Sequence, residues 1–346
     1  MAGCGEGADS GEALGSGDKA ATGASSKKAV GRKVPAPGQK TAKAKKTGES
    51  FGKLRPQEPD VDVFKAPAAR RLYPSIGSEA NVRLIDAGTG AKAPLRYALR
   101  TGTTEPMVMR MTMAMTMNLP GMGEKTMELP VMVMRGTNRV LSVDPTGTSS
   151  VAFSIDSVDV EGGGDPVMNA QLKLELSKFT GIKGTYHFTS RGITTKTEMD
   201  TSSVNDASIR KTMETMRQSM EQASSPFPVE AVGNGARWEV LQHIESEGMT
   251  IRQRVEYKLE SRSGQSVSLS VKLTQAADPQ DISTPEMGGM TARLESYSAT
   301  GGGNLEANLA GITPNGTLTL NNQAKMSIAG QSTSMSMNMN IKVGTK

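Results

Sequence analysis

The sequence predicts an α+β fold, mainly antiparallel β, in which a large curved, half-barrel-like sheet carries one or two packed helices. Two observations predict it. Apolar residues alternate with polar ones at a period of two in many segments, as a strand with one apolar face requires. Glycine and proline are frequent, with 38 and 17 residues among 346, and they divide the chain into short segments.

Residues 1–60 differ from the rest in composition, being rich in Gly, Ala, Ser, Lys and Pro. They offer little apolar surface to offset the entropy lost on ordering, so we expect a disordered tether with an r.m.s. span of about 40 Å. Its 11 basic and 7 acidic residues carry 11 − 7 = +4 of the net charge of +5, leaving +1 for residues 61–346. Its lysines either contact anionic lipid headgroups or only keep the linker soluble. Because the basic charge belongs to the tether, we expect no nucleic-acid partner.

The only cysteine is Cys4, in the opening Met1-Ala2-Gly3-Cys4. This opening resembles the end of a bacterial lipobox, in which small residues precede the cysteine that receives lipid. The charged and apolar regions of a signal peptide are missing, so lipidation of Cys4 requires a translation start upstream of Met1. The alternative is a cysteine that falls there by chance. A single cysteine excludes a disulfide within the chain and a zinc site built on cysteines.

The ordered chain is expected to begin near Arg70, with short strands over 81–87 and 94–101. The clearest strand follows, because every second residue is a methionine: Met107, Met109, Met111, Met113, Met115 and Met117. Residues 120–123 turn the chain. The period of two then resumes at Met127, Leu129, Val131 and Val133, with Pro130 indicating a sheet edge or a bulge.

The middle of the chain mixes strands with the two predicted helices. Strands over 139–143 and 149–160 precede a helix over 166–179, and a hairpin over 184–199 turns at Arg191-Gly192. The second helix has apolar residues at spacings of four, three and four along one face: Ile209, Met213, Met216 and Met220. Asn205 or Asp206 is its candidate N-cap, and Pro226 ends it.

The rest of the chain is nearly all strand, predicted over 237–245, 249–261, 265–275, 292–299, 317–328 and 334–343. Residues 277–290 are expected to form a loop, and the glycines at 301–303 a turn. Met335, Met337 and Met339 repeat the alternation seen near residue 110, so the two methionine strands are expected to share one sheet face. Residues 61–346 then form one β-rich domain, or two halves divided near 205–235.

Residues suited to catalysis are few. His187 and His243 are the only histidines, and each falls alone in a predicted strand. The sequence lacks a serine-nucleophile elbow, a P-loop and a dinucleotide-binding fingerprint. We therefore expect no enzyme, no catalytic residue and no cofactor.

The alternating methionines admit three interpretations. They fill a core face, or they line an adaptable apolar groove for an acyl chain or a peptide, or they bind Cu(I) through their thioethers. Alternate residues of one strand lie about 7 Å apart, too far for one ion, whereas cross-strand pairs lie at about 4.5–5.5 Å. No histidine or cysteine accompanies the repeats, so no metal site is assigned.

Residues 226–238, with the sequence PFPVEAVGNGARW, follow the second predicted helix. Gly233 and Gly235 permit tight turns, and Trp238, the only tryptophan, can anchor a core where a strand begins. Together with the hairpin at Arg191-Gly192, this stretch resembles an uncharacterised family of bacterial β-rich envelope proteins, often lipoproteins, over about residues 90–345. The resemblance implies export and no particular activity.

These observations predict a tethered envelope lipoprotein with a non-catalytic binding or structural role, anchored in a membrane through Cys4 and facing the periplasm. Its partners would be the membrane and either an apolar ligand or an envelope protein. One alternative is a soluble carrier of an acyl chain in a methionine-lined groove, and another is a methionine-based copper-binding protein. The lipoprotein carriers of the bacterial envelope have a related general plan, a half-barrel with a helix across its mouth.

Overall fold

The computed structural model describes residues 72–75, 78–119, 121, 123–162, 165–202, 207–222, 226–246, 248–283, 291–328 and 330–346. All of them belong to one compact unit, Pro56–Lys346. Cys4, the tether expected over residues 1–60, the expected start of order at Arg70 and the candidate caps Asn205 and Asp206 lie outside the described residues.

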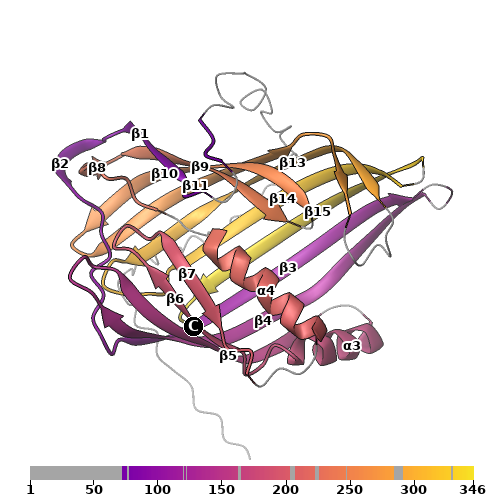
Figure 1. The fold of residues 1–346 in the computed structure, drawn as a ribbon, viewed down its shortest axis with the longest axis horizontal. Helices are drawn as coiled ribbons and strands as arrows, with labels where there is room; N and C mark the ends of the chain where they lie inside the picture. The colour runs from indigo at the N-terminus through magenta and orange to yellow at the C-terminus, as the bar shows by residue number, and fades with distance from the viewer. Residues whose placement is uncertain are drawn as a thin grey trace, which may run out of the picture. The chain divides into compact units, whose positions relative to one another are not determined.

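One antiparallel sheet of 13 strands dominates the described part of the chain, which confirms the predicted fold class. Its strand order is β1-β9-β10-β11-β13-β14-β15-β3-β4-β5-β6-β7, with β12 beside β13, while β2 and β8 form a separate pair. Figure 1 shows the large sheet as a curved, open surface. The first seven strands are β1 (Asn81–Asp86), β2 (Thr89–Ala93), β3 (Thr104–Leu119), β4 (Gly123–Val143), β5 (Ser149–Glu161), β6 (Lys183–Phe188) and β7 (Thr194–Met199). The others are β8 (Val232–Asn234), β9 (Arg237–Ser246), β10 (Met249–Ser263), β11 (Ser266–Ala277), β12 (Gln280–Ile282), β13 (Ala292–Asn308), β14 (Asn315–Ile328) and β15 (Gln331–Gly344).

The register assigns each side chain to one of two faces, because directly opposed residues of antiparallel strands lie on the same side of a sheet. One such row crosses nine strands: Trp238, Tyr257, Val271, Gly303, Leu318, Ile341, Met111, Met132 and Val160. We call the face that carries this row the inner face. The core around Trp238 and the core around Ile155 both lie on it. Strands that precede residues 205–235 in the chain and strands that follow them therefore share one apolar face.

Both predicted helices are confirmed. Helix α3 (Pro166–Ser177) begins after Asp165, whose carboxylate accepts the backbone N–H of Val167, and Pro166 occupies the first turn, where no N–H is needed. Helix α4 (Ala207–Gln222) buries Met213 against the core around Ile155, and in Figure 1 it lies in front of the sheet beside β7.

The predicted strand over 94–101 is wrong. The segment belongs to no strand; its backbone N–H groups bond instead to separate parts of the chain, from Tyr97 to the carbonyl of Ser190 and from Ala98 to the carbonyl of Leu309, both at 2.7 Å. Its buried residues, Leu95 and Leu99, enter two different core clusters. The apolar residues that suggested a strand thus connect two parts of the core.

Two further expectations for the C-terminal half are wrong. The glycines at 301–303 do not turn the chain but lie in the middle of β13, close to the backbone of neighbouring strands. The loop expected over 277–290 contains the short strand β12, which pairs with the start of β13.

Residues 226–238 are held by hydrogen bonds to several separate parts of the chain. The indole Nε1 of Trp238 donates to the carbonyl of Pro226 at 3.1 Å, and the N–H of Phe227 donates to the carbonyl of Arg191 in the β6–β7 turn at 2.8 Å. Arg96 adds bonds to the carbonyls of Pro228 and Val229. Strand β9 is thereby connected to the β6–β7 hairpin at the far end of the strand order.

Candidate functional site

The structure brings the methionines of β3 and β15 together on the inner face. The two strands are neighbours, and Met117, Met115 and Met113 stand directly opposite Met335, Met337 and Met339. Met111 and Met109 continue the row of pairs opposite Ile341 and Val343. Met107 completes the set opposite Gly136 on β4. The nine methionines selected from the sequence therefore occupy one continuous surface.

Strand β4 adds three methionines to this surface, and the sequence predicted them only in part. Pro130 lies at a bulge, where the partner of Met111 is Met132 but the partner of Met113 is Leu129. The bulge shifts the alternation by one residue, so Met132 and Met134 lie on the inner face, and the expected Val131 and Val133 lie on the opposite face, where Val133 is nevertheless fully buried. Proline in an otherwise alternating strand was the signal for this shift. We call the surface formed by Met127, Met132, Met134 and the nine methionines of β3 and β15 the methionine face.

The methionine face is apolar and only half-buried, and the exposed Lys125 of β4, opposite Met117, adds a charge at one end of it. Its methionines are partly buried, and Met127 is exposed at 40%. Within β14, β15 and β3, Glu105 is the only charged residue on the inner face, and its carboxylate accepts the backbone N–H groups of Ile312 and Thr313 at 2.9 Å. The outer face of β15 instead carries the polar residues Ser334, Ser336, Asn338, Asn340 and Lys342. A sheet with this division exposes one face to water and reserves the other for apolar contact.

A polar group interrupts the inner face beside the methionines. Gln253, Gln275, Ala299, Asn322 and Met337 form one row across β10, β11, β13, β14 and β15. The amide of Gln275 donates to Gln253 at 2.6 Å and accepts the hydroxyl of Tyr297 at 2.9 Å. Asn322 is 9% exposed, and its Oδ1 has no hydrogen-bond partner.

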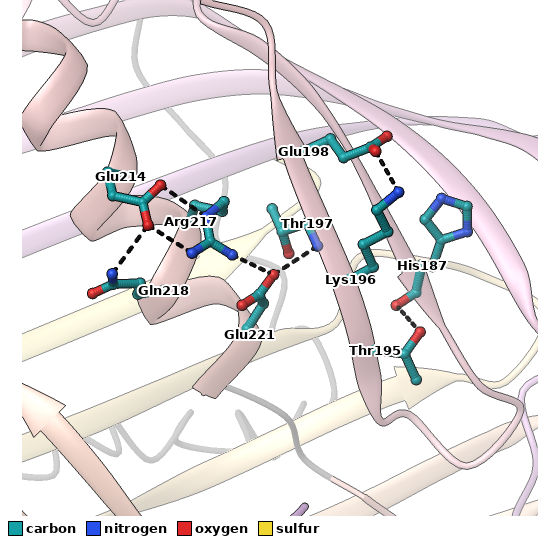
Figure 2. A network of polar contacts seen from close by, with 9 residues as sticks. All are labelled: His187, Thr195, Lys196, Thr197, Glu198, Glu214, Arg217, Gln218 and Glu221. Atoms are coloured by element: carbon teal, nitrogen blue, oxygen red, sulfur yellow. Dashed lines mark hydrogen bonds and ion pairs between the residues drawn. The ribbon is translucent and has the colours of Figure 1, made fainter. Parts of the chain in front are cut away.

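Helix α4 is attached at one margin of this surface. Its apolar side packs on the cluster that includes Met134 and Val158, and its polar side bonds to β7. Figure 2 shows Glu221 accepting the backbone N–H of Thr197 at 2.9 Å and the guanidinium of Arg217 at 2.8 Å. The hydrogen bonds from Arg217 to Glu214 hold the pKa of Glu214 below its usual value and raise that of Arg217. This network fixes the helix on the sheet and leaves no free acid or base within it.

The two histidines lie far from each other in the strand order and in different surroundings. His187, in β6, is opposite Lys196 of β7. His243, in β9, has its Nδ1 2.8 Å from the carbonyl of Pro74 and its ring against Tyr73. Among the described residues no group of three or more His, Cys, Asp or Glu side chains is placed to hold a metal ion. Neither histidine belongs to the methionine face.

The sequence resembles an uncharacterised family over part of its length. Residues 175–311, less than half of the chain, match a family described as a family of unknown function (DUF6263). No curated protein matches the sequence. Among solved structures, DynF from the dynemicin biosynthesis pathway of Micromonospora chersina is similar over 77% of this chain and 91% of its own, with 8% identity and a TM-score of 0.15. A TM-score this low carries no argument about fold or function.

Proposed function

We propose that this protein is a non-catalytic binding protein that holds an uncharged apolar ligand, such as an acyl chain, on its methionine face. The observation that supports this proposal is the register of β3, β4 and β15, which gathers twelve methionines on one half-buried surface. A face meant only as core would be better specified by leucine, isoleucine and valine, which have fewer rotamers than methionine. Flexible thioether side chains instead adapt to ligands of varied shape.

The methionines at the centre of this face, from Met109 to Met115 on β3, have no charged residue opposite them on β15 or β4, which favours the same class of ligand. An ionised group placed there would lose its hydration without a partner in β14 or β15. A hydrocarbon chain, by contrast, gains about 0.8 kcal/mol for each methylene group removed from water. The ligand is therefore proposed to contact the methionines with its apolar part.

The replacement Met115→Glu tests the proposal, because Met115 lies in the central row between Met337 and Met127. We expect this variant to bind the uncharged dye N-phenyl-1-naphthylamine at least about tenfold more weakly, since a carboxylate in an apolar site costs more than 1.4 kcal/mol. Fluorescence titration measures the dissociation constant. Thr112→Glu, which introduces the same carboxylate at an exposed position on the outer face of β3, should bind the dye as the wild type does. Equal binding by the two variants, or no binding by the wild type, would contradict the proposal.

The row Met337-Met115-Met127 also supports a second candidate, a Cu(I) site formed by thioethers from three neighbouring strands. Titration with Cu(I), carried out alongside the dye titration, separates copper binding from binding of an apolar ligand. Saturable binding of about one ion, lost in both Met115→Leu and Met115→Glu, would favour copper. Dye binding that survives Met115→Leu, without Cu(I) affinity above that of free methionine, would favour the apolar ligand.

The envelope location and lipid anchor are a separate proposal that rests on Cys4 and the composition of residues 1–60. In the described residues, no helix is long and apolar enough to cross a bilayer. We expect protein expressed from its native locus to carry a diacylglyceryl-type mass gain on Cys4 and to sediment with membranes. Cys4→Ala should move most of it to the soluble fraction, because a lipid anchor supplies the membrane affinity. An unmodified Met1 in a soluble wild-type protein would refute this anchor.

A further inference from the structure

Asn322 is a polar side chain placed where the sheet offers it no partner. It lies on the inner face of β14 and is 9% exposed, and its Oδ1 makes no hydrogen bond. A buried amide oxygen in this state is destabilising, because it has lost its bonds to water without replacement. Such a group in a folded protein requires an explanation.

The register explains why another rotamer of Asn322 would not give its side-chain oxygen a hydrogen-bond partner. The four nearest positions on the same face are Ala299 and Met337 across the neighbouring strands and Leu320 and Ala324 along β14. None of these side chains carries a hydrogen-bond donor. The isolation of Asn322 thus follows from strand pairing and not from one choice of rotamer.

The nearest amides on the face are already engaged. Gln275 is in the same row but two strands away, about 10 Å at the usual strand spacing. Its side chain bonds to Gln253 and Tyr297. Tyr297 is a diagonal neighbour of Asn322, and its hydroxyl donates to Gln275. A single bridging water would be poorly held as well, because a buried water needs two to four polar partners.

We propose that Asn322 accepts a hydrogen bond from a neutral O–H or N–H group on the apolar ligand of the methionine face. This assignment rests on the function proposed above and adds the ligand's chemistry to it. The ligand would be an uncharged amphiphile, a long chain bearing a hydroxyl or an amide N–H. Its donor would lie over Asn322, and its chain would extend over Met337, which is directly opposite, and on to Met115.

A pair of matched ligands tests this assignment on the full-length protein. Dodecan-1-ol and 1-methoxydodecane have similar chains, but only the alcohol carries a donor, and each is measured by its displacement of N-phenyl-1-naphthylamine. We expect the wild type to prefer the alcohol by about tenfold, the factor that corresponds to one good hydrogen bond of about 1.4 kcal/mol. In Asn322→Leu this preference should fall by about tenfold while the affinity for the ether stays within about twofold.

Thermal unfolding distinguishes recognition from a structural role. Because Leu removes an unpaired polar group of similar size, Asn322→Leu should raise the melting temperature by a few degrees, the shift that corresponds to about 1 kcal/mol. The control Gln323→Leu, at the next and exposed position on the outer face, should leave the ligand preference unchanged. An unchanged preference for the alcohol in Asn322→Leu would overturn the assignment of Asn322 but not the proposed function. A lowered melting temperature together with an equal loss of affinity for both ligands would do the same. Failure of both ligands to displace the dye from the wild type would overturn the proposed function as well.

Discussion

Trp238→Ala is expected to lower the free energy of unfolding by about 3–5 kcal/mol, because it removes the largest buried side chain of the inner face. Trp238 is 1% exposed, stacks on Tyr257 with ring centroids 5.4 Å apart, and meets the edge of Phe227 at 6.3 Å. Its Nε1 also donates to the carbonyl of Pro226, so truncation leaves a buried acceptor unpaired. A loss of this size is a large part of a typical domain stability of about 5–15 kcal/mol.

Urea denaturation followed by far-UV circular dichroism measures this effect, since the variant has no tryptophan fluorescence. Trp238→Phe is the informative comparison, because it keeps an aromatic ring against Tyr257 but lacks the N–H group. We expect it to lose about half as much stability as the alanine variant. Val229→Ala, at a residue 64% exposed in the same segment, should change stability by less than about 0.5 kcal/mol. A loss below about 1 kcal/mol in Trp238→Ala would show that residues 226–238 do not hold this end of the sheet.

The positions of the strands could be predicted from the sequence better than the pairing of one strand with another. Alternation placed β3 and β15 correctly, because a period of two depends only on residues within one strand. The pairing of these two strands depends on contacts more than 200 residues apart, and alternation carries no information about it. The choice of inward residues in β4 also failed after Pro130, since one inserted residue reverses the alternation for everything that follows.

The isolated Asn322 could not be found from the sequence for the same reason. In the chain it is one polar residue in the run Asn321-Asn322-Gln323, which fits an exposed strand. Its burial follows only from the identity of its cross-strand neighbours, Ala299 and Met337. The methionines of the candidate site were visible as a pattern, whereas the polar group beside them required the register.

The triple glycine of β13 was misassigned because glycine has two structural uses. A turn needs its positive φ, whereas Gly301, Gly302 and Gly303 all lack a positive φ. Gly301 and Gly303 are required instead by close approach of the neighbouring strand: a Cβ on Gly301 would lie 2.6 Å from the carbonyl oxygen of Thr319, and one on Gly303 would overlap the carbonyl oxygen of Thr317. The sequence alone does not distinguish the two uses.

Gly303→Ala is therefore expected to destabilise the sheet by about 3 kcal/mol, because the added methyl group collides with backbone that no side-chain rotation can relieve. Gly302→Ala is the matched control on the outer face of the same strand, where the new Cβ would meet its nearest atom, the carbonyl oxygen of Val271, at 3.2 Å. Both changes restrict the unfolded chain equally, by about 0.4–1 kcal/mol, so the difference between them isolates the collision. Urea denaturation monitored through Trp238 fluorescence measures both variants. Equal stability of the two would mean that β13 and β14 can separate without cost. A large difference would mean that their close approach fixes the register that places Asn322 opposite Ala299.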